Sequence, residues 1–259
     1  MDSRPDANEA PDVGDRPGAP EEREWTAPPD DATLDESALA GLGSGTRGLF
    51  ITFEGLDGCG KSTQMALLAE ALTDAGYDVL TTREPGGTEL GEALRSVLLD
   101  VGYAGMSSRA EALLYAAARA QLVEEVVRPA LDDGRVVLCD RYIDSSLAYQ
   151  GHGRGLVIED VITLNVWATD CLFPDLTIAL LVDEDIRLGR AASEAADRLE
   201  SEEAAFFLRV AEGYRRLAED HPHRIRVIDG AGAIAEVHDC VTAAVEEEFG
   251  LFSAPDPAD

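Results

Sequence analysis

The chain has 259 residues, 45% of them apolar, and its 51 acidic and 21 basic residues give a formal net charge of −30. This length and composition favour one α/β domain with an extension over two full domains. The acidic balance argues against nucleic acid and anionic membranes as partners. The chain also lacks a long apolar run and a signal-peptide pattern, so we expect a cytoplasmic protein.

Lysine is almost absent, because the 21 basic residues comprise 20 arginines and the single Lys61. At molar salt the Debye length falls to about 3 Å, which suppresses the self-repulsion of so acidic a surface. We therefore expect a halophilic protein from a salt-loaded cell. An acidic protein from an ordinary cell would share the charge, but that alternative leaves the missing lysines unexplained.

The ends of the chain differ from its middle. Residues 1–47 hold six of the 12 prolines and show no apolar periodicity, so this acidic, Pro-rich extension is predicted to be disordered. The folded domain is expected over 48–250, with a flexible tail over 251–259. The cysteines show no C-x-x-C spacing, which argues against a zinc site or disulfides. We expect them to be small buried fillers: Cys59, Cys139, Cys171 and Cys240.

Strand and helix patterns alternate along the domain, which is typical of a parallel sheet with helices on both faces. In chain order, apolar and β-branched runs predict strands over 48–53, 77–82, 136–139, 176–182 and 224–228. Helical spacing of apolar residues predicts helices over 61–75, 88–99, 108–131, 159–170 and 234–249, and charged helical segments over 185–217. Pro129 is the point at which the helix over 108–131 could break. Ligands of such sheets bind at the carboxyl ends of the strands.

The first predicted strand is followed by G-L-D-G-C-G-K-S over 55–62, which matches the G-x4-G-K-[ST] phosphate-binding loop. A position between a strand and a helix is the structural context that this motif requires. The glycines let backbone N–H groups face phosphate oxygens, and Ser62 is suited to Mg²⁺. Lys61 carries a compact ammonium on a slim side chain, whose space a planar guanidinium would not fit. Cys59 is interpreted as a space-filling residue.

The loop alone leaves the reaction class open between an NTPase switch, a motor and a small-molecule kinase. A GTPase would carry an N-K-x-D motif that reads guanine, and a chain whose one lysine lies in the phosphate loop lacks it. A motor would carry a long apolar strand that ends in a hydrolytic Asp-Glu pair, and none is found in the sequence.

Three further segments narrow the class. T-R-E-P-G-G-T over 82–88 follows the second strand, D-R-Y-I-D-S-S-L-A-Y-Q-G over 140–151 follows the third, and G-R-G over 153–155 lies just beyond. With F-E-G-L-D-G over 53–58, these segments resemble the thymidylate kinase family across roughly 49–249. The resemblance implies a P-loop NTPase-type three-layer α/β sandwich, with a five-stranded parallel sheet and a small helical lid. It also implies a homodimer that transfers the γ-phosphoryl group of ATP to dTMP in the presence of Mg²⁺.

The resemblance also assigns residues to the site. It implies that Lys61, Arg141 and Arg190 are catalytic and that Ser62 and Asp57 lie near the metal. The residues implied to hold the ATP phosphates are Gly55, Leu56, Asp57, Gly58, Cys59, Gly60, Lys61, Ser62 and Thr63. The residues implied to bind dTMP are Asp57, Arg83, Arg95, Tyr115, Arg119, Arg141, Ser146, Tyr149 and Gln150.

Four of these residues have particular implied roles. Arg141 would grip the acceptor phosphate, and its alternative is a salt bridge at a strand end. Tyr115 and Arg119 share a helix face because they are four residues apart, and the resemblance makes them the ring that stacks on thymine and the donor to its carbonyl edge. Without the resemblance, Tyr115 would be interpreted as core. Tyr149 would exclude a 2′-hydroxyl by its bulk.

The phosphate loop has Gly58 where some family members have arginine, and such members usually carry catalytic arginines in the lid. The corresponding stretch over 187–200 is poor in arginine. Arg190 is the first candidate, followed by Arg187 and Arg198, and the alternative for each is a solvated helix charge. If none of the three acts in catalysis, Arg154 becomes the candidate.

Two other functions remain open from the sequence. A broader nucleotide or deoxynucleoside kinase would need a general base for a neutral 5′-hydroxyl, which Glu84 could supply, whereas the many arginines favour a phosphate acceptor. An ATP-bound regulatory protein without catalysis is the other alternative. The intact Lys61, Ser62 and Arg141 argue against it.

Overall fold

The computed structural model describes residues 47–183, 186 and 197–252. The predicted extension up to residue 46 and the predicted tail from residue 253 lie outside the described residues. The lid candidates Arg187 and Arg190 also lie outside them.

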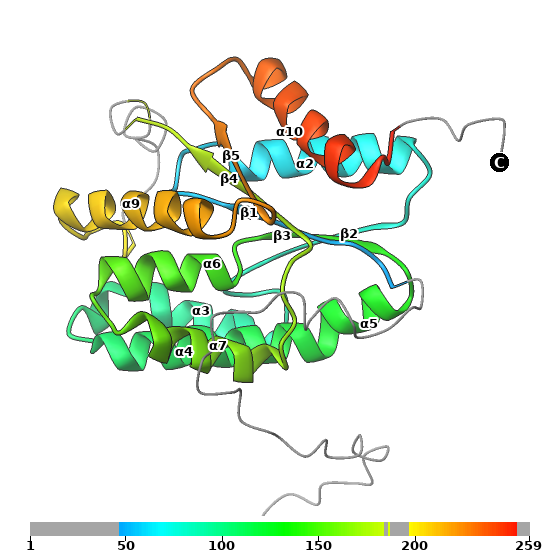
Figure 1. Ribbon diagram of the computed structural model, residues 1–259. Helices are drawn as coiled ribbons and strands as arrows, with labels where there is room; N and C mark the ends of the chain where they lie inside the picture. The colour runs from blue at the N-terminus through cyan, green and yellow to red at the C-terminus, as the bar shows by residue number, and fades with distance from the viewer. Residues whose placement is uncertain (1–46, 184–185, 187–196, 253–259) are drawn as a thin grey trace, which may run out of the picture. The chain divides into compact units, whose positions relative to one another are not determined.

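Five parallel strands form a sheet in the order β2-β3-β1-β4-β5 (Figure 1). They are β1 (Phe50–Glu54), β2 (Val79–Arg83), β3 (Val136–Asp140), β4 (Leu176–Leu181) and β5 (Ile225–Asp229). The predicted five-stranded parallel sheet is confirmed. Asp140 pairs in register with Phe53 of β1 and with Arg83 of β2, so three strands end at one level and bring their following loops together.

Helices cover both faces of the sheet, as the alternation of strands and helices predicts (Figure 1). One face carries α2 (Lys61–Asp74) and α10 (Ile234–Phe249). On the other side lie α4 (Ser108–Leu122), η2 (Val123–Val127), α5 (Arg128–Asp132), α6 (Ile143–Ser146), η3 (Leu147–Gly153), α7 (Ile158–Thr169) and α9 (Ala204–Asp220). The helix α3 (Glu89–Leu99) packs against α4, and the short η1 (Val101–Tyr103) follows it.

Two apolar cores enclose the sheet, because successive strand residues point to opposite faces. In β1, Phe50 belongs to one core, whereas Ile51 and Phe53 belong to the other. All five residues of β1 are buried, as expected for the central strand of a covered parallel sheet. This burial anchors the loop that follows Glu54.

The helix predicted over 108–131 is interrupted in the structure. α4 ends at Leu122, a wider π-helical turn forms η2, and α5 begins at Arg128, which places Pro129 in the first turn of α5. A proline is tolerated there because the first N–H groups of a helix have no acceptor within it. The segment 143–153, for which no element is predicted, forms α6 and η3 and buries Ile143 and Leu147.

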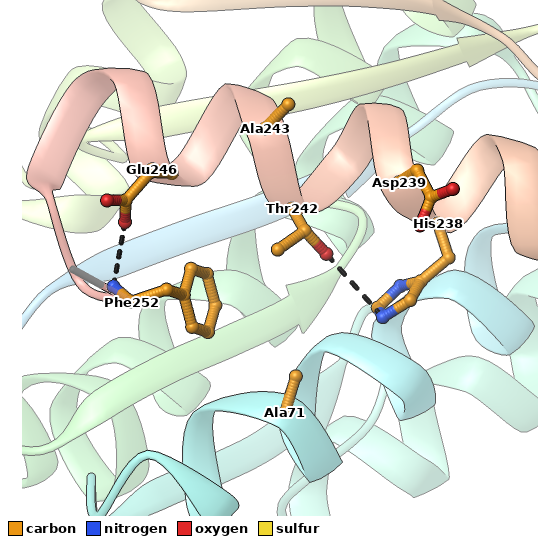
Figure 2. Close-up of a pocket in the computed structure, with 7 residues that line it drawn as sticks. All are labelled: Ala71, His238, Asp239, Thr242, Ala243, Glu246 and Phe252. Carbon is orange, nitrogen blue, oxygen red and sulfur yellow. Dashed lines mark hydrogen bonds between the residues drawn. The ribbon is translucent and has the colours of Figure 1, made fainter. Parts of the chain in front are cut away.

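Leu251 and Phe252, which the sequence assigns to the flexible tail, instead pack against the core beneath α10. Gly250 ends α10 with a φ of 64°, and the chain turns back so that the N–H of Phe252 donates to Glu246 Oε2 at 2.7 Å. Phe252 lines a hollow of about 520 Å³ between α2 and α10, opposite Ala71 (Figure 2). The phosphate loop contributes no residue to this hollow.

The cysteine prediction is half right. Cys59 and Cys139 are buried, but Cys171 and Cys240 are exposed. Cys240 lies on the outward face of α10, next to the buried Val241. The spacing of cysteines along the chain does not show which face of a helix each one occupies. In the described part of the chain, no helix combines the length and apolar character that a membrane span requires.

Candidate active site

The phosphate loop connects the end of β1 to the start of α2. Gly55 has a φ of 130°, and a Cβ atom at this position would lie 2.2 Å from the carbonyl oxygen of Leu180. Only glycine therefore lets the loop pass so close to β4. Gly60, with a φ of 102°, precedes Lys61, the first residue of α2. The N-terminus of α2 thus faces the loop, and its dipole favours an anion there.

Lys61 is buried at the base of this loop, with 6% of its surface exposed. Its Nζ donates to the carbonyl oxygens of Gly55 and Leu56, both at 3.1 Å, and lies 3.6 Å from Asp57 Oδ1. The ammonium is thus held between the loop backbone and one carboxylate. These contacts suit the compact ammonium and slim side chain of lysine better than the planar guanidinium of arginine.

Arg141 lies directly after β3, and its guanidinium contacts the phosphate loop. Its Nη2 donates to Asp57 Oδ1 at 2.7 Å and to Tyr149 Oη at 3.3 Å. Burial alone would raise the pKa of Asp57, but the charges of Arg141 and Lys61 lower it well below its usual range. An ionised Asp57 therefore connects the lysine of the loop to the arginine of the neighbouring strand.

Ser62 contacts a residue that the sequence reasoning did not assign. Its Oγ donates to Asp140 Oδ2 at 3.0 Å, while Asp140 Oδ1 is buried without a hydrogen-bond partner among the described residues. The sequence shows Asp140 at the end of an apolar strand, but only the structure shows that this strand lies beside β1. Asp57, which the resemblance places near the metal, pairs with Lys61 and Arg141 in this structure.

One cavity of about 970 Å³ opens at the carboxyl ends of the strands and brings most predicted site residues together. On the donor side the predicted residues that line it are Asp57, Gly58, Gly60, Lys61, Ser62 and Thr63. On the acceptor side they are Arg83, Arg95, Tyr115, Arg141, Ser146, Tyr149 and Gln150. Four predicted residues are not among those that line it: Gly55, Leu56, Cys59 and Arg119.

Arg119 is fully buried beneath the cavity and is held by several acceptors. Its Nε donates to Glu84 Oε2 at 2.7 Å and its Nη1 to Ser146 Oγ at 2.8 Å. Further acceptors are Asn165 Oδ1 and, at 2.9 Å, the carbonyl oxygen of Tyr142. Burial raises the pKa of Glu84 despite the arginine beside it. Arg119 thus supports Glu84 and Ser146, which both line the cavity.

Arg154 and Arg198 share one buried carboxylate, Glu111 of α4. Arg154 Nη2 lies 2.9 Å and Arg198 Nη1 2.7 Å from Glu111 Oε2, and Gln150 Nε2 donates to Oε1 at 3.1 Å. Arg198 is also fixed by the carbonyl oxygen of Leu98 at 2.6 Å. The alternative of a solvated helix charge is therefore wrong for Arg198, whose guanidinium is buried and paired.

The two remaining arginines of the cavity are less enclosed. Arg83 is exposed and pairs with Glu92 at 3.0 Å, whereas Arg95 is half-buried and its Nη1 donates to the carbonyl oxygen of Pro85 at 3.0 Å. Both guanidinium groups line the cavity with Arg141. A phosphate loop, its lysine and three arginines around one cavity define a P-loop phosphotransferase with two anionic substrates.

The comparisons with known proteins identify the family. The thymidylate kinase family model matches residues 53–241, and the chain belongs to this family, whose reaction is the ATP-dependent phosphorylation of dTMP to dTDP. A thymidylate kinase from Caldanaerobacter subterraneus subsp. tengcongensis is 50% identical over 201 residues, which cover 78% of this chain and 96% of that protein. One from Pelotomaculum thermopropionicum is 50% identical over 208 residues, covering 80% and 96%.

A solved structure agrees with these matches. The crystal structure of thymidylate kinase from Ehrlichia chaffeensis superposes with a TM-score of 0.64 at 36% sequence identity, covering 77% of this chain and 99% of that one. The family resemblance inferred from the motifs is confirmed.

Proposed function

We propose that this chain phosphorylates dTMP by direct transfer of the γ-phosphoryl group of ATP, with the two nucleotides meeting in the 970 Å³ cavity. Lys61 would neutralise the donor phosphates, and Arg141 would hold the acceptor phosphate beside the transferring group. The acceptor oxygen belongs to an ionised phosphate, so the reaction needs no strong general base and no covalent enzyme intermediate.

The barrier that these residues lower is the repulsion between two anions, which a surface of net charge −30 increases. Asp57 bridges Lys61 and Arg141, so the two cations are held in a fixed relation before substrates bind. Fixed donors aimed at the transferring group stabilise its developing charge without reorganisation. Loss of one such donor typically costs on the order of 10²–10³-fold in turnover.

The site also suits Mg²⁺, which the family reaction implies. Ser62 Oγ lies 3.0 Å from Asp140 Oδ2, and the orphaned Oδ1 of Asp140 provides an oxygen acceptor beside it. Mg²⁺ binds through one or two protein oxygens together with waters and substrate phosphates, and in this reaction it would neutralise charge on the phosphates of ATP. Among the described residues no cluster of three acidic, His or Cys ligands exists.

The remaining wall of the cavity would select the nucleoside. Tyr115, Ser146 and Gln150 line the cavity, and we propose that the Tyr115 ring would stack on the base while Ser146 and Gln150 would offer hydroxyl and amide groups to its edge. Arg119 would act on the base through Ser146, to which it donates at 2.8 Å. Tyr149, whose hydroxyl accepts from Arg141 at 3.3 Å, would leave no room for a 2′-hydroxyl.

A lid arginine would complete the site, and Arg190 remains the first candidate, with Arg187 behind it. Arg198 and Arg154 are bound to Glu111, which supports a structural role for both. We expect Arg190→Ala to lower turnover with little change in dTMP binding. Unchanged turnover in both Arg190→Ala and Arg187→Ala would contradict the lid assignment.

We also propose a homodimer formed through neighbouring helices α3, α4 and α7. Large apolar side chains are exposed on this part of the molecule, including Leu90, Leu113 and Trp167 at 47%, 57% and 64%. Exposed apolar area of this kind marks protein interfaces. Light scattering should give twice the chain mass for the wild type and the chain mass for a Leu113→Glu, Trp167→Glu variant. A monomeric wild type would refute the proposal.

The observation that carries the proposed function is the convergence of Lys61, Arg141 and Tyr115 on one cavity. The test is an acceptor panel of dTMP, dUMP, UMP and thymidine with Mg²⁺-ATP in concentrated KCl. We expect dTMP to be the preferred acceptor and thymidine to be inert, because thymidine has no phosphate for the arginines to hold. Preferential phosphorylation of thymidine would instead favour a deoxynucleoside kinase.

A further inference from the structure

Glu54 is a fully buried carboxylate at the end of β1, immediately before the phosphate loop, and the proposed reaction assigns it no role. Its Oε1 accepts from the backbone N–H groups of Tyr142 at 2.8 Å and Ser145 at 3.2 Å. Its Oε2 accepts from Ser145 Oγ at 2.6 Å and Tyr214 Oη at 2.8 Å. A carboxylate is costly to bury, and four donors drawn from two segments surround this one.

The backbone that Glu54 binds is the turn that carries Arg141. Arg141 has a φ of 74°, in the left-handed region that residues other than glycine rarely adopt. The N–H of Arg141 donates to the carbonyl oxygen of Phe53 at 2.9 Å, and the next N–H, of Tyr142, donates to Glu54. Such a conformation persists only where its surroundings hold it, and here the end of β1 supplies both acceptors.

Glu54 also controls the two hydroxyl groups that face the guanidinium. Arg141 Nη1 lies 3.2 Å from Ser145 Oγ and 3.5 Å from Tyr214 Oη. A guanidinium only donates hydrogen bonds, so both hydroxyls must accept from it and must send their own protons elsewhere. The carboxylate of Glu54 takes those protons and thereby turns the hydroxyl lone pairs toward Arg141.

We propose that Glu54 is a positioning residue, which fixes the guanidinium of Arg141 relative to the phosphate loop by acting through Ser145 and Tyr214. The inference rests on the proposed role of Arg141 at the acceptor phosphate. Because Glu54 adjoins Gly55, the same strand end sets the donor loop and the acceptor arginine. With Nη1 held by the two hydroxyls, Nη2 stays on Asp57 at the cavity wall.

A double-mutant cycle tests this proposal with the full-length protein in mildly alkaline, concentrated KCl. Glu54→Gln and Tyr214→Phe are each made alone and with Arg141→Ala, and turnover of dTMP, dTMP binding by calorimetry and thermal melting are measured. The matched control is Asp175→Asn, a carboxylate that accepts the N–H of Phe50 at 2.8 Å at the opposite end of β1.

We expect Glu54→Gln to lower kcat/KM for dTMP by about tenfold or more, because small displacements of a positioned group have large effects on rate. The KM for ATP should change little. In the Arg141→Ala background, Glu54→Gln should cost less than about twofold, since the residue through which it acts is gone. Asp175→Asn should leave the kinetic constants unchanged.

Equal losses from Glu54→Gln in both backgrounds, or no loss in the wild-type background, would overturn the proposal. If Glu54→Gln does not fold, Tyr214→Phe gives the same cycle with one hydroxyl removed, and an equal loss in both backgrounds would likewise overturn it. The measurement of dTMP binding by calorimetry needs no turnover, so a failure of the proposal for Glu54 can be told from a failure of the proposed reaction. A failure of the proposed reaction would appear as a wild-type protein that does not phosphorylate dTMP.

Discussion

The buried pair of Arg119 and Glu84 gives the sharpest stability prediction. Arg119 is fully buried and Glu84 is 4% exposed, and replacement of Arg119 by methionine removes the arginine's donors. Glu84 would be left as a buried carboxylate without its cation, and its Oε1 already lacks a partner among the described residues. Breaking such a pair typically costs about 3–5 kcal/mol, whereas an exposed pair contributes about 0–1 kcal/mol.

The assay is thermal and urea unfolding of Arg119→Met beside a matched control, Arg83→Met, whose pair with Glu92 is exposed on both sides. For a folded region of this size, each kcal/mol shifts Tm by about 2–4 °C, so Arg119→Met should lower Tm by roughly 6–20 °C. Arg83→Met should lower it by less than about 4 °C. Salt and protein concentration are held constant, so that the two variants differ only in the pair removed.

Equal shifts for the two variants would refute the reasoning. They would mean that the buried arginine contributes no more than a solvated one. A large loss for Arg119→Met that Glu84→Gln does not reduce in the double variant would also contradict it, because the cost is attributed to the unpaired carboxylate.

Three further predictions concern the net charge of the chain, the pKa of Glu54 and the ring of Tyr149. With a net charge of −30, Tm should rise steadily from about 0.1 M to multimolar KCl, and a flat response would refute the halophilic interpretation. Burial and the neighbouring Asp144 raise the pKa of Glu54 from 4.5 to about 7, against the opposing effects of Ser145, Arg141 and Tyr214. Its stabilising contribution is therefore complete below pH 4.5 and lost as the pH rises through 7. Urea titrations should show that the stability of the wild type relative to Glu54→Gln falls by up to about 3 kcal/mol across that range, and a constant difference would contradict this. Tyr149→Ala should improve turnover of ribonucleotide acceptors relative to dTMP, and an unchanged preference in the acceptor panel would reject the role of its ring.

The sequence was sufficient for the sheet and for the place of the phosphate loop between β1 and α2. The strands predicted from apolar runs, the helix after Lys61 and the helix over 234–249 depend on local patterns, and the structure reproduces them within about two residues. The phosphate loop is contiguous, so its geometry follows from its own glycines. The acceptor residues were predictable only through the family resemblance, because they come from separate elements.

What the sequence could not predict depends on contacts between distant segments. Glu54 reads as the last residue of a strand, and its importance appears only when Ser145 and Tyr214, 91 and 160 residues away, meet it. The sequence left Arg198 as a lid candidate or a solvated charge, because nothing local shows that Glu111 lies beside it. The wider turn after Leu122 lies before Pro129, the one break that the sequence indicates in this helix, and helical periodicity does not show it.

The central claim is that Lys61 and Arg141 hold two nucleotide anions in one cavity, and that the lysine of the loop cannot be an arginine. The most direct measurement is the initial rate of dTDP formation from dTMP and Mg²⁺-ATP by Lys61→Arg, which keeps the charge in a space with 3.1 Å contacts to two loop carbonyls. We predict a loss on the order of 10²-fold or more with unchanged folding. A variant that forms dTDP at the wild-type rate would contradict the account.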